Sequence, residues 1–257
     1  MIPWVQKGLL TGIKTTGYPA REDASPGVSP GLPLGGEYPE QQASSLVDRC
    51  PTGAITLAGG QTVVDYRRCV HCFRCTRGTA APIGWSPKYE WAALVGEGAE
   101  TQRGLGRAFQ HSAHILVVDA GDCGACLNEV KQLNNPYYNM HRLGFFITPT
   151  PRQADILLVV GVLTDQMRAP LQKAYDAMPT PKRVMAVGAC ALSGSVFGPS
   201  FVCGSGVGDF LPVDVAVPGN PPPPLAILHG LLVAVEREPS TALLSPECGA
   251  AQEARMR

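Results

Sequence analysis

The sequence predicts an α/β fold: a parallel β-sheet with helices on both faces, preceded by a small cysteine-rich α+β unit. In the second half of the 257-residue chain, short apolar runs alternate with helical patterns; the runs cover 114–119, 156–163, 183–187 and 212–217. Apolar residues at nearly every position are typical of strands buried on both faces of a parallel sheet. The first half instead concentrates Pro, Gly and clustered cysteines. We therefore expect two units of different architecture.

The first 44 residues predict a short helix followed by an irregular segment. Apolar residues recur at helical spacing within residues 1–18, with Lys7 and Lys14 off their stripe. The stripe consists of Ile2, Val5, Leu9 and Ile13. Such a helix can lie on a membrane surface or a hydrophobic partner, or it can dock on its own domain. Residues 19–44 are rich in Pro and Gly, so we expect them to wrap or link.

Four cysteines within residues 45–90 form the strongest motif of the chain: Cys50, followed by Pro51, and then Cys69, Cys72 and Cys75. In bacterial two-cluster ferredoxins each motif runs CxxCxxCxxxCP, and its last Cys ligates the other cluster. Here the positions that would complete a second cluster hold Glu40, Ala43, Leu46 and Thr79. The remaining four cysteines are a full ligand set for one 4Fe–4S cluster.

A structural zinc site is the alternative for this motif, because zinc also takes four thiolates. Zinc sites usually pair two CxxC knuckles, whereas a CxxCxxC run with a remote Cys-Pro favours a cubane cluster. His71 lies inside the loop, where it can hydrogen-bond a sulfur or point into solvent. We expect it to point into solvent.

Helical patterns follow the apolar runs of the second half, at 127–133, 166–177 and 223–238. Thr164 or Asp165 is expected to cap the middle helix. This alternation predicts a flavodoxin-like α/β unit after a small ferredoxin-like α+β unit. The expected segments are the helix and wrapping segment 1–44, a single-cluster domain 45–90, the α/β domain 110–238, and a flexible tail 239–257 that holds Cys248 as a spare thiol.

A second set of cysteines follows the predicted strands. Cys123 and Cys126 come directly after the first strand, and Cys190 comes after the strand at 183–187. Ligands of open α/β sheets bind outside the carboxyl ends of the strands, so these thiols should converge. Neighbouring glycines let backbone N–H groups approach an anionic cluster. A phosphate-binding loop is disfavoured because neither GxGxxG nor a Lys-Ser/Thr signature is present.

The sequence does not decide which residue is the fourth ligand of this second site. Its natural position, in the turn after the strand at 212–217, holds Asn220. An amide oxygen is a hard, weak ligand compared with thiolate. Cys203 is the candidate replacement. The alternatives are a 4Fe–4S cluster completed by Cys203, a three-thiolate site holding a 4Fe–4S cluster with one exchangeable iron or a 3Fe–4S cluster, and an α/β domain without a cluster.

Composition narrows the function further. Charged residues make up only 16% of the chain, against about 25% in typical soluble domains, which suggests a surface covered by partner subunits. No apolar stretch approaches the roughly 18–20 residues of a membrane span, and balanced charge argues against nucleic acid. Cysteines in ligand motifs, with no secretory or twin-arginine signal before them, predict a cytoplasm-facing protein.

Residues 114–237 resemble the small, cluster-bearing subunit of complex-I-related membrane-bound nickel–iron hydrogenases and its homologue in respiratory complex I. The motifs are CGACLNE at 123–129, NPYYNMHRLGF at 135–145, TPRQADILLVVG at 150–161, GACALSG at 188–194 and LPVDVAVPG at 211–219. This resemblance implies Cys123, Cys126 and Cys190 as cluster ligands. The family's fourth ligand is a Cys in PGCPP, where this chain has Asn220.

Residues 1–90 resemble the ferredoxin-like subunit of formate hydrogenlyase and related hydrogenases. The cues are Lys7 five residues before Gly12, the TTGYP sequence at 15–19, CPTGAI at 50–55 and the CxxCxxC loop. Members of that family usually carry two 4Fe–4S clusters, and this chain retains the ligands of one. The chain thus looks like a fusion of two neighbouring subunits.

The two resemblances imply an electron-transfer subunit of a membrane-associated hydrogenase-like or complex-I-like oxidoreductase. It would relay electrons between iron–sulfur clusters and a catalytic large subunit, on the cytoplasmic face of the inner membrane, beside membrane-arm and other electron-transfer subunits. No complete active site is expected on this chain, and no transmembrane span. The alternative is an assembly or scaffold subunit whose α/β domain has lost its cluster. A flavodoxin-like reductase ranks third, since fold alone does not imply function.

Overall fold

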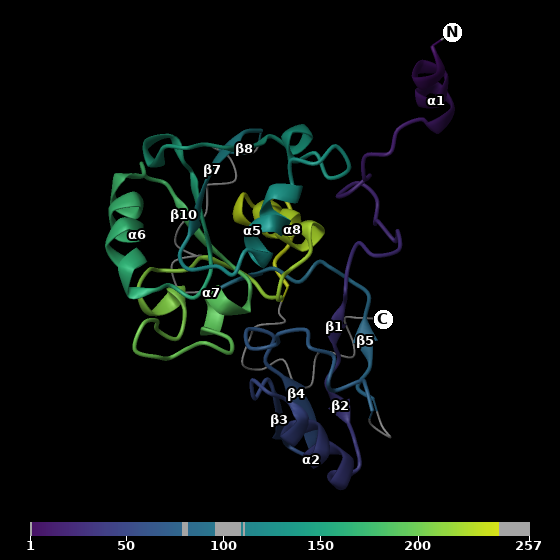
Figure 1. The fold of residues 1–257 in the computed structure, drawn as a ribbon, viewed down its shortest axis with the longest axis vertical. Helices are drawn as coiled ribbons and strands as arrows, with labels where there is room; N and C mark the ends of the chain where they lie inside the picture. Colours follow the sequence, from purple (N-terminus) through teal and green to yellow (C-terminus); the bar gives the residue numbers. More distant parts are fainter. Residues whose placement is uncertain (1, 79–81, 96–108, 110, 242–257) are drawn as a thin grey trace.

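The computed structural model describes residues 2–78, 82–95, 109 and 111–241. The chain folds into an α/β unit and a smaller cysteine-rich unit (Figure 1). Cys248 and most of the predicted tail lie outside the described residues, as does Thr79.

The α/β unit is built on a six-stranded sheet within the described part of the chain. Its spatial order is β6 (Ala93–Leu94), β11 (Val215–Val217), β10 (Arg183–Val187), β9 (Ile156–Val160), β7 (Ala113–Asp119) and β8 (Phe145–Ile147). All neighbours pair in parallel except β6, which runs antiparallel to β11 at the edge. The parallel strands therefore follow the 2-1-3-4-5 order of flavodoxin-like folds, as predicted.

Helices cover both faces of this sheet. One apolar core contains side chains of α5 (Ala125–Gln132) and α8 (Pro224–Ala234), and the core on the opposite face contains side chains of α6 (Asp165–Ala177) and α7 (Ala189–Ser193). Every residue of α8 is buried, which is expected of a helix that is apolar all round. The 3₁₀ turns are Met140–Leu143, Pro151–Gln153 and Val207–Asp209.

Some predicted boundaries in this unit are too generous. The strand expected over 156–163 ends at Val160, because Gly161 and Leu163 turn the backbone into the left-handed region (φ 93° and 52°). The strand expected over 212–217 begins at Val215. Thr164 occupies the N-cap position of α6, but its side chain makes no capping hydrogen bond.

The cysteine-rich unit contains the antiparallel sheet β2 (Gly36–Glu37), β4 (Gln61–Val64) and β3 (Ile55–Ala58), with α2 (Glu40–Arg49) packed against β3. Two further short strands, β1 (Leu32–Pro33) and β5 (Trp85–Ser86), pair with each other in antiparallel fashion. The prediction that residues 19–44 are irregular is wrong at the short strands β1 and β2 and from Glu40 onward. Ala43 and Leu46, at two positions of missing cluster ligands, are buried on the inner face of α2. These two positions therefore contribute to the apolar interior of the unit.

The N-terminal helix α1 (Pro3–Thr11) has no buried residue, and it projects away from both units (Figure 1). The alternative that it docks on its own domain is therefore wrong for this structure. The segment that follows does contact the α/β unit, since Thr16 N donates to Tyr137 O (2.8 Å) and the Tyr137 hydroxyl donates to Asp23 Oδ2 (2.7 Å). Within the described residues, no helix has the length and apolar character needed to cross a bilayer.

Candidate iron–sulfur sites

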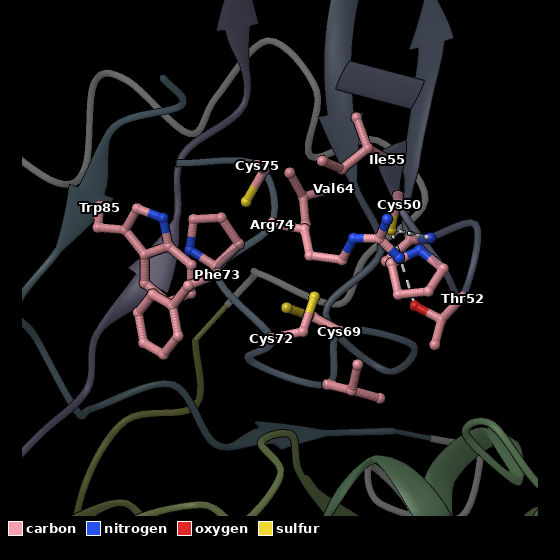
Figure 2. Close-up of a pocket in the computed structure, with 14 residues that line it drawn as sticks. Cys50, Thr52, Ile55, Val64, Cys69, Cys72, Phe73, Arg74, Cys75 and Trp85 are labelled. Atoms are coloured by element: carbon pink, nitrogen blue, oxygen red, sulfur yellow. Dashed lines mark hydrogen bonds between the residues drawn. The ribbon is translucent and has the colours of Figure 1, made fainter. Parts of the chain in front are cut away.

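All four cysteines of the first motif line one pocket (Figure 2). Trp85, Phe73, Ile55 and Val64 supply most of its apolar wall. The structure therefore brings Cys50, which follows α2, together with the loop that carries Cys69, Cys72 and Cys75.

Local backbone geometry explains how three cysteines of one short loop reach the same pocket. His71 and Phe73 adopt left-handed conformations (φ 49° and 59°), which non-glycine residues rarely adopt unless their surroundings impose it. Arg49, the last residue of α2, ties the helix to this loop by donating hydrogen bonds to the carbonyls of Arg74 (3.2 Å) and Arg77 (2.7 Å).

The environments of these thiols differ in ways that suit metal ligands. Burial alone would raise the pKa of Cys50, but hydrogen bonds from Thr52, Ile55 and Ala54 outweigh it and lower the pKa; Ala54 N donates to Cys50 Sγ at 3.2 Å. Burial raises the pKa of Cys69 to about 12, and the nearby Cys75, Cys50 and Cys72 add to the rise. Four thiolates so close together would repel one another unless bound iron neutralised them.

His71 does not point into solvent, contrary to the expectation. It is buried, with ring centroids 5.8 Å from Trp85 and 6.1 Å from Trp91, both edge to face. Burial lowers its pKa to about 4, so the ring is neutral near pH 7. Neither ring nitrogen has a hydrogen-bond partner among the described residues.

The second set of cysteines also converges. Cys123 lies in the exposed turn after β7, whereas Cys126 in α5 and Cys190 in α7 are buried. Burial raises the pKa of Cys126, followed by the negative charges of Asp122, Cys190 and Cys123. A Cβ atom on Gly188 would lie 2.6 Å from Cys126 Sγ. Glycine is therefore required where the turn before Cys190 meets α5.

Asp122 is a residue of this site that motif reasoning missed. Its Oδ2 accepts hydrogen bonds from Gly124 N (2.9 Å) and Leu127 N (3.0 Å), which caps the N-terminus of α5. Oδ1 is buried without a partner within the described chain. The sequence analysis missed this role because it placed the helix start at residue 127, whereas α5 begins at Ala125, three residues after Asp122.

Asn220 and Cys203 both belong to segments next to the turn that carries Cys190. Two hydrogen bonds, Gly188 N to Val217 O (2.8 Å) and Ala189 N to Gly219 O (2.7 Å), hold the Asn220 turn beside the turn that carries Cys190. Cys203 is buried in a small cluster with Cys190 and Val162. Its sulfur lies 3.2 Å from Ser200 Oγ and 3.5 Å from the Phe197 carbonyl, so the thiol interacts with its own loop. Which of the two residues completes the site stays a prediction.

The donor chemistry fits the cofactors that the motifs predict. Soft thiolates are the ligands that iron–sulfur clusters use, and N–H donors to the sulfurs are a common feature of their surroundings. The first site offers four thiols and the second three. In the described ranges, no three Cys, His, Asp or Glu side chains are already arranged around a common metal position.

Comparison with known proteins places the α/β unit in a family. Residues 123–234 match the family of the 20 kDa subunit of NADH:ubiquinone oxidoreductase. The protein named "Probable membrane-bound hydrogenase subunit mbhJ" of Pyrococcus furiosus is 41% identical over 126 residues, which cover 49% of this chain and 75% of that protein. The chain belongs to this family. The predicted family resemblance of the α/β unit is thereby confirmed.

Two other proteins are similar to the chain. A subunit of the NADH-quinone oxidoreductase of Clostridium beijerinckii is 42% identical over 113 residues, 44% of this chain and 67% of that protein. Formate hydrogenlyase subunit 7 of Escherichia coli is 36% identical over 137 residues, 53% of this chain. The chain spans about half (54%) of that protein's length. The ferredoxin-like resemblance of residues 1–90 stays a prediction, because the family match lies in the α/β unit.

Proposed function

We propose that this chain is an electron-transfer subunit of a membrane-associated, hydrogenase-like or complex-I-like oxidoreductase. Cys50, Cys69, Cys72 and Cys75 hold one 4Fe–4S cluster in the cysteine-rich unit. A second cluster is held by Cys123, Cys126 and Cys190 at the carboxyl edge of the sheet. The observation that carries the proposal is the presence of two converging sets of thiols in one chain, one of them in the family-matched unit.

The protein's own residues determine how each site works. Bound clusters supply one-electron redox chemistry, and their reduction potentials depend on hydrogen bonds to sulfur and on burial. At the first site, the N–H of Ala54 and the Thr52 side chain face Cys50, so they stabilise the more negative, reduced state. At the second site, the negative charge of Asp122 beside Cys126 destabilises the more negative, reduced state.

The partners are proposed from the names of the relatives. Those proteins are subunits of a membrane-bound hydrogenase, a formate hydrogenlyase and an NADH-quinone oxidoreductase. We infer a catalytic large subunit next to the second site, further electron-transfer subunits, and membrane-arm subunits. A peripheral position on the cytoplasmic face of the inner membrane agrees with the exposed apolar side chains of α1, such as Trp4 and Leu10.

A second candidate function is that of an assembly or scaffold subunit in which only the first site is redox-active. Asn220 favours it, because an amide replaces the thiolate at the position where the family resemblance implies a Cys. On this view the two units still join a large subunit to the membrane arm, and the thiols at the carboxyl edge of the sheet hold no iron.

Serine variants of anaerobically purified protein, kept with its partners, distinguish the two functions. A reductive EPR titration of the unmodified protein should give two spin systems, and Cys123→Ser should remove or change one of them. Cys248→Ser, at a cysteine outside both motifs, is the matched control and should change neither. A single spin system that Cys123→Ser leaves unchanged would overturn the relay and support the scaffold.

A further inference from the structure

One side chain, Trp91, contacts the loops of both cysteine sites. Its indole is buried (1% exposed) in the segment before β6. Nε1 donates a hydrogen bond of 2.8 Å to the carbonyl of Pro218, the first residue of the turn that contains Asn220. The same ring meets His71, between Cys69 and Cys72, with centroids 6.1 Å apart and planes at 83°. The sequence offered no signal for this role, because Trp91 belongs to neither motif.

Trp91 contacts the loop that carries Cys69 and Cys72 by aromatic packing alone. His71 lies between the indoles of Trp85 and Trp91 and has no hydrogen-bond partner within the described chain. Edge-to-face aromatic pairs constrain the orientation of both rings. Aromatic packing around His71 thus holds the loop that carries Cys69 and Cys72, in addition to the hydrogen bonds from Arg49 to the same loop.

Trp91 contacts the second site through a hydrogen bond from its indole N–H to the Pro218 carbonyl. A buried indole N–H needs an acceptor, and here the acceptor is a backbone carbonyl that belongs to the turn. The residues around that carbonyl are hydrogen-bonded in turn to the amides of Gly188 and Ala189, which precede Cys190. Removal of the indole N–H would leave the Pro218 carbonyl without this donor.

A separate contact joins the segment before Cys69 to α7, the helix that carries Cys190. The hydroxyl of Ser193 in α7 lies 2.9 Å from the carbonyl of Arg67, two residues before Cys69, and 3.0 Å from the Ala189 carbonyl in its own helix. In Figure 1, α7 lies on the side of the α/β unit that faces the cysteine-rich unit. The two sites are thus tied together by their own loops.

We propose that Trp91 is a positioning residue that fixes the first cysteine loop against the Asn220 turn and so sets the placement of the two sites relative to each other. Its importance for electron relay rests on the proposed function. The positioning itself is a property of the chain and holds whether or not the second site carries a cluster.

Hydrogen exchange with mass spectrometry tests the positioning on the full chain. Trp91→Phe keeps an aromatic ring but loses the indole N–H together with part of the ring, so the amides of Gly188 and Ala189 should exchange at least about tenfold faster, the effect of one lost hydrogen bond. Tyr89→Phe is the matched control, since it also deletes one buried hydrogen bond, from Asp23 N (2.8 Å), away from both sites. Equal exchange in Trp91→Phe and unmodified protein, or an equal rise in Tyr89→Phe, would overturn the proposal.

Spectroscopy of the iron-loaded protein tests the consequence for the two sites. When iron analysis gives two clusters per chain, Trp91→Phe should alter the magnetic interaction between them at unchanged iron content, whereas Tyr89→Phe should not. An unaltered interaction would contradict the positioning role. When iron analysis gives one cluster, the relay fails on that count alone, and hydrogen exchange still decides whether Trp91 positions the loops.

Discussion

At the scale of single residues, the surroundings of each thiol determine how readily it becomes a thiolate. Cys50 receives hydrogen bonds from neighbouring N–H groups, and these lower its pKa despite its burial. Cys69 lies in the same pocket, yet burial and the other three thiols raise its pKa to about 12. Two ligands of one predicted cluster thus differ sharply before iron binds.

This difference predicts the order of alkylation in metal-free protein. At pH 8, iodoacetamide should modify Cys50 at least several-fold faster than Cys69, because the thiolate is the reacting form. Peptide mass spectrometry over time measures both rates. Thr52→Val removes a hydroxyl that lies 3.7 Å from Cys50 Sγ. This variant should slow the alkylation of Cys50 and leave the alkylation rate of Cys69 unchanged. Earlier labelling of Cys69 would contradict the described environments.

The residue scale also shows what motif reasoning can and cannot find. The cysteines were predictable because ligand spacing is a local property of the sequence. The burial of His71 was not, since it results from Trp85 and Trp91, which are distant in the sequence from the loop. A side chain inside a polar loop is expected to be exposed until tertiary contacts are known.

At the scale of elements, α8 shows how a titratable side chain can be built into an apolar helix. His229 is buried there; its Nδ1 accepts a hydrogen bond from Ala92 N (3.1 Å), and Nε2 lies 3.3 Å from the Pro239 carbonyl. This pairing suits a neutral ring protonated on Nε2. Burial lowers the pKa of His229 to about 4.

The lowered pKa of His229 predicts a loss of stability in mild acid. Between pH 6.5 and 4 this histidine binds a proton in the unfolded chain but stays neutral in the native protein. As the pH falls through this range, the free energy of unfolding should therefore decrease by up to about 3 kcal/mol from this group. His71 contributes in the same direction. Urea unfolding at several pH values measures the slope.

Two variants test whether His229 causes this dependence of stability on pH. His229→Gln keeps an acceptor for Ala92 N but cannot titrate, so its stability should vary less between pH 6.5 and 4. His111→Gln, at an exposed histidine, should leave the slope unchanged. An identical slope in His229→Gln and the unmodified protein would show that the ring is not held neutral by burial.

Element boundaries were less predictable than element types. The strands β7 and β10 and the helix α6 lie within one residue of their predicted ranges, because their apolar periodicity is strong. The helix α2 was missed, since a Pro- and Gly-rich segment leads directly into it. Its amphipathic pattern places Ala43 and Leu46 on one face, which a search for helical spacing could have found.

At the scale of the whole molecule, the parallel sheet with helices on both faces followed from the alternation of strands and helices. The short strands β8 and β6 were not predicted, and with them the full strand order. The way in which the two units meet did not follow. The bond from Trp91 to Pro218 joins residues 127 positions apart, and that from Ser193 to Arg67 spans 126. Such contacts depend on the complete fold and leave no periodic trace in the sequence.

The central claim, that one chain carries two iron–sulfur clusters, is tested most directly by counting iron and acid-labile sulfide. The measurement uses protein purified anaerobically with its partners. About eight of each per chain, or about seven iron if the second cluster is 3Fe–4S, is the predicted result. About four of each, unchanged in Cys123→Ser, would contradict the account and leave the α/β unit as a scaffold.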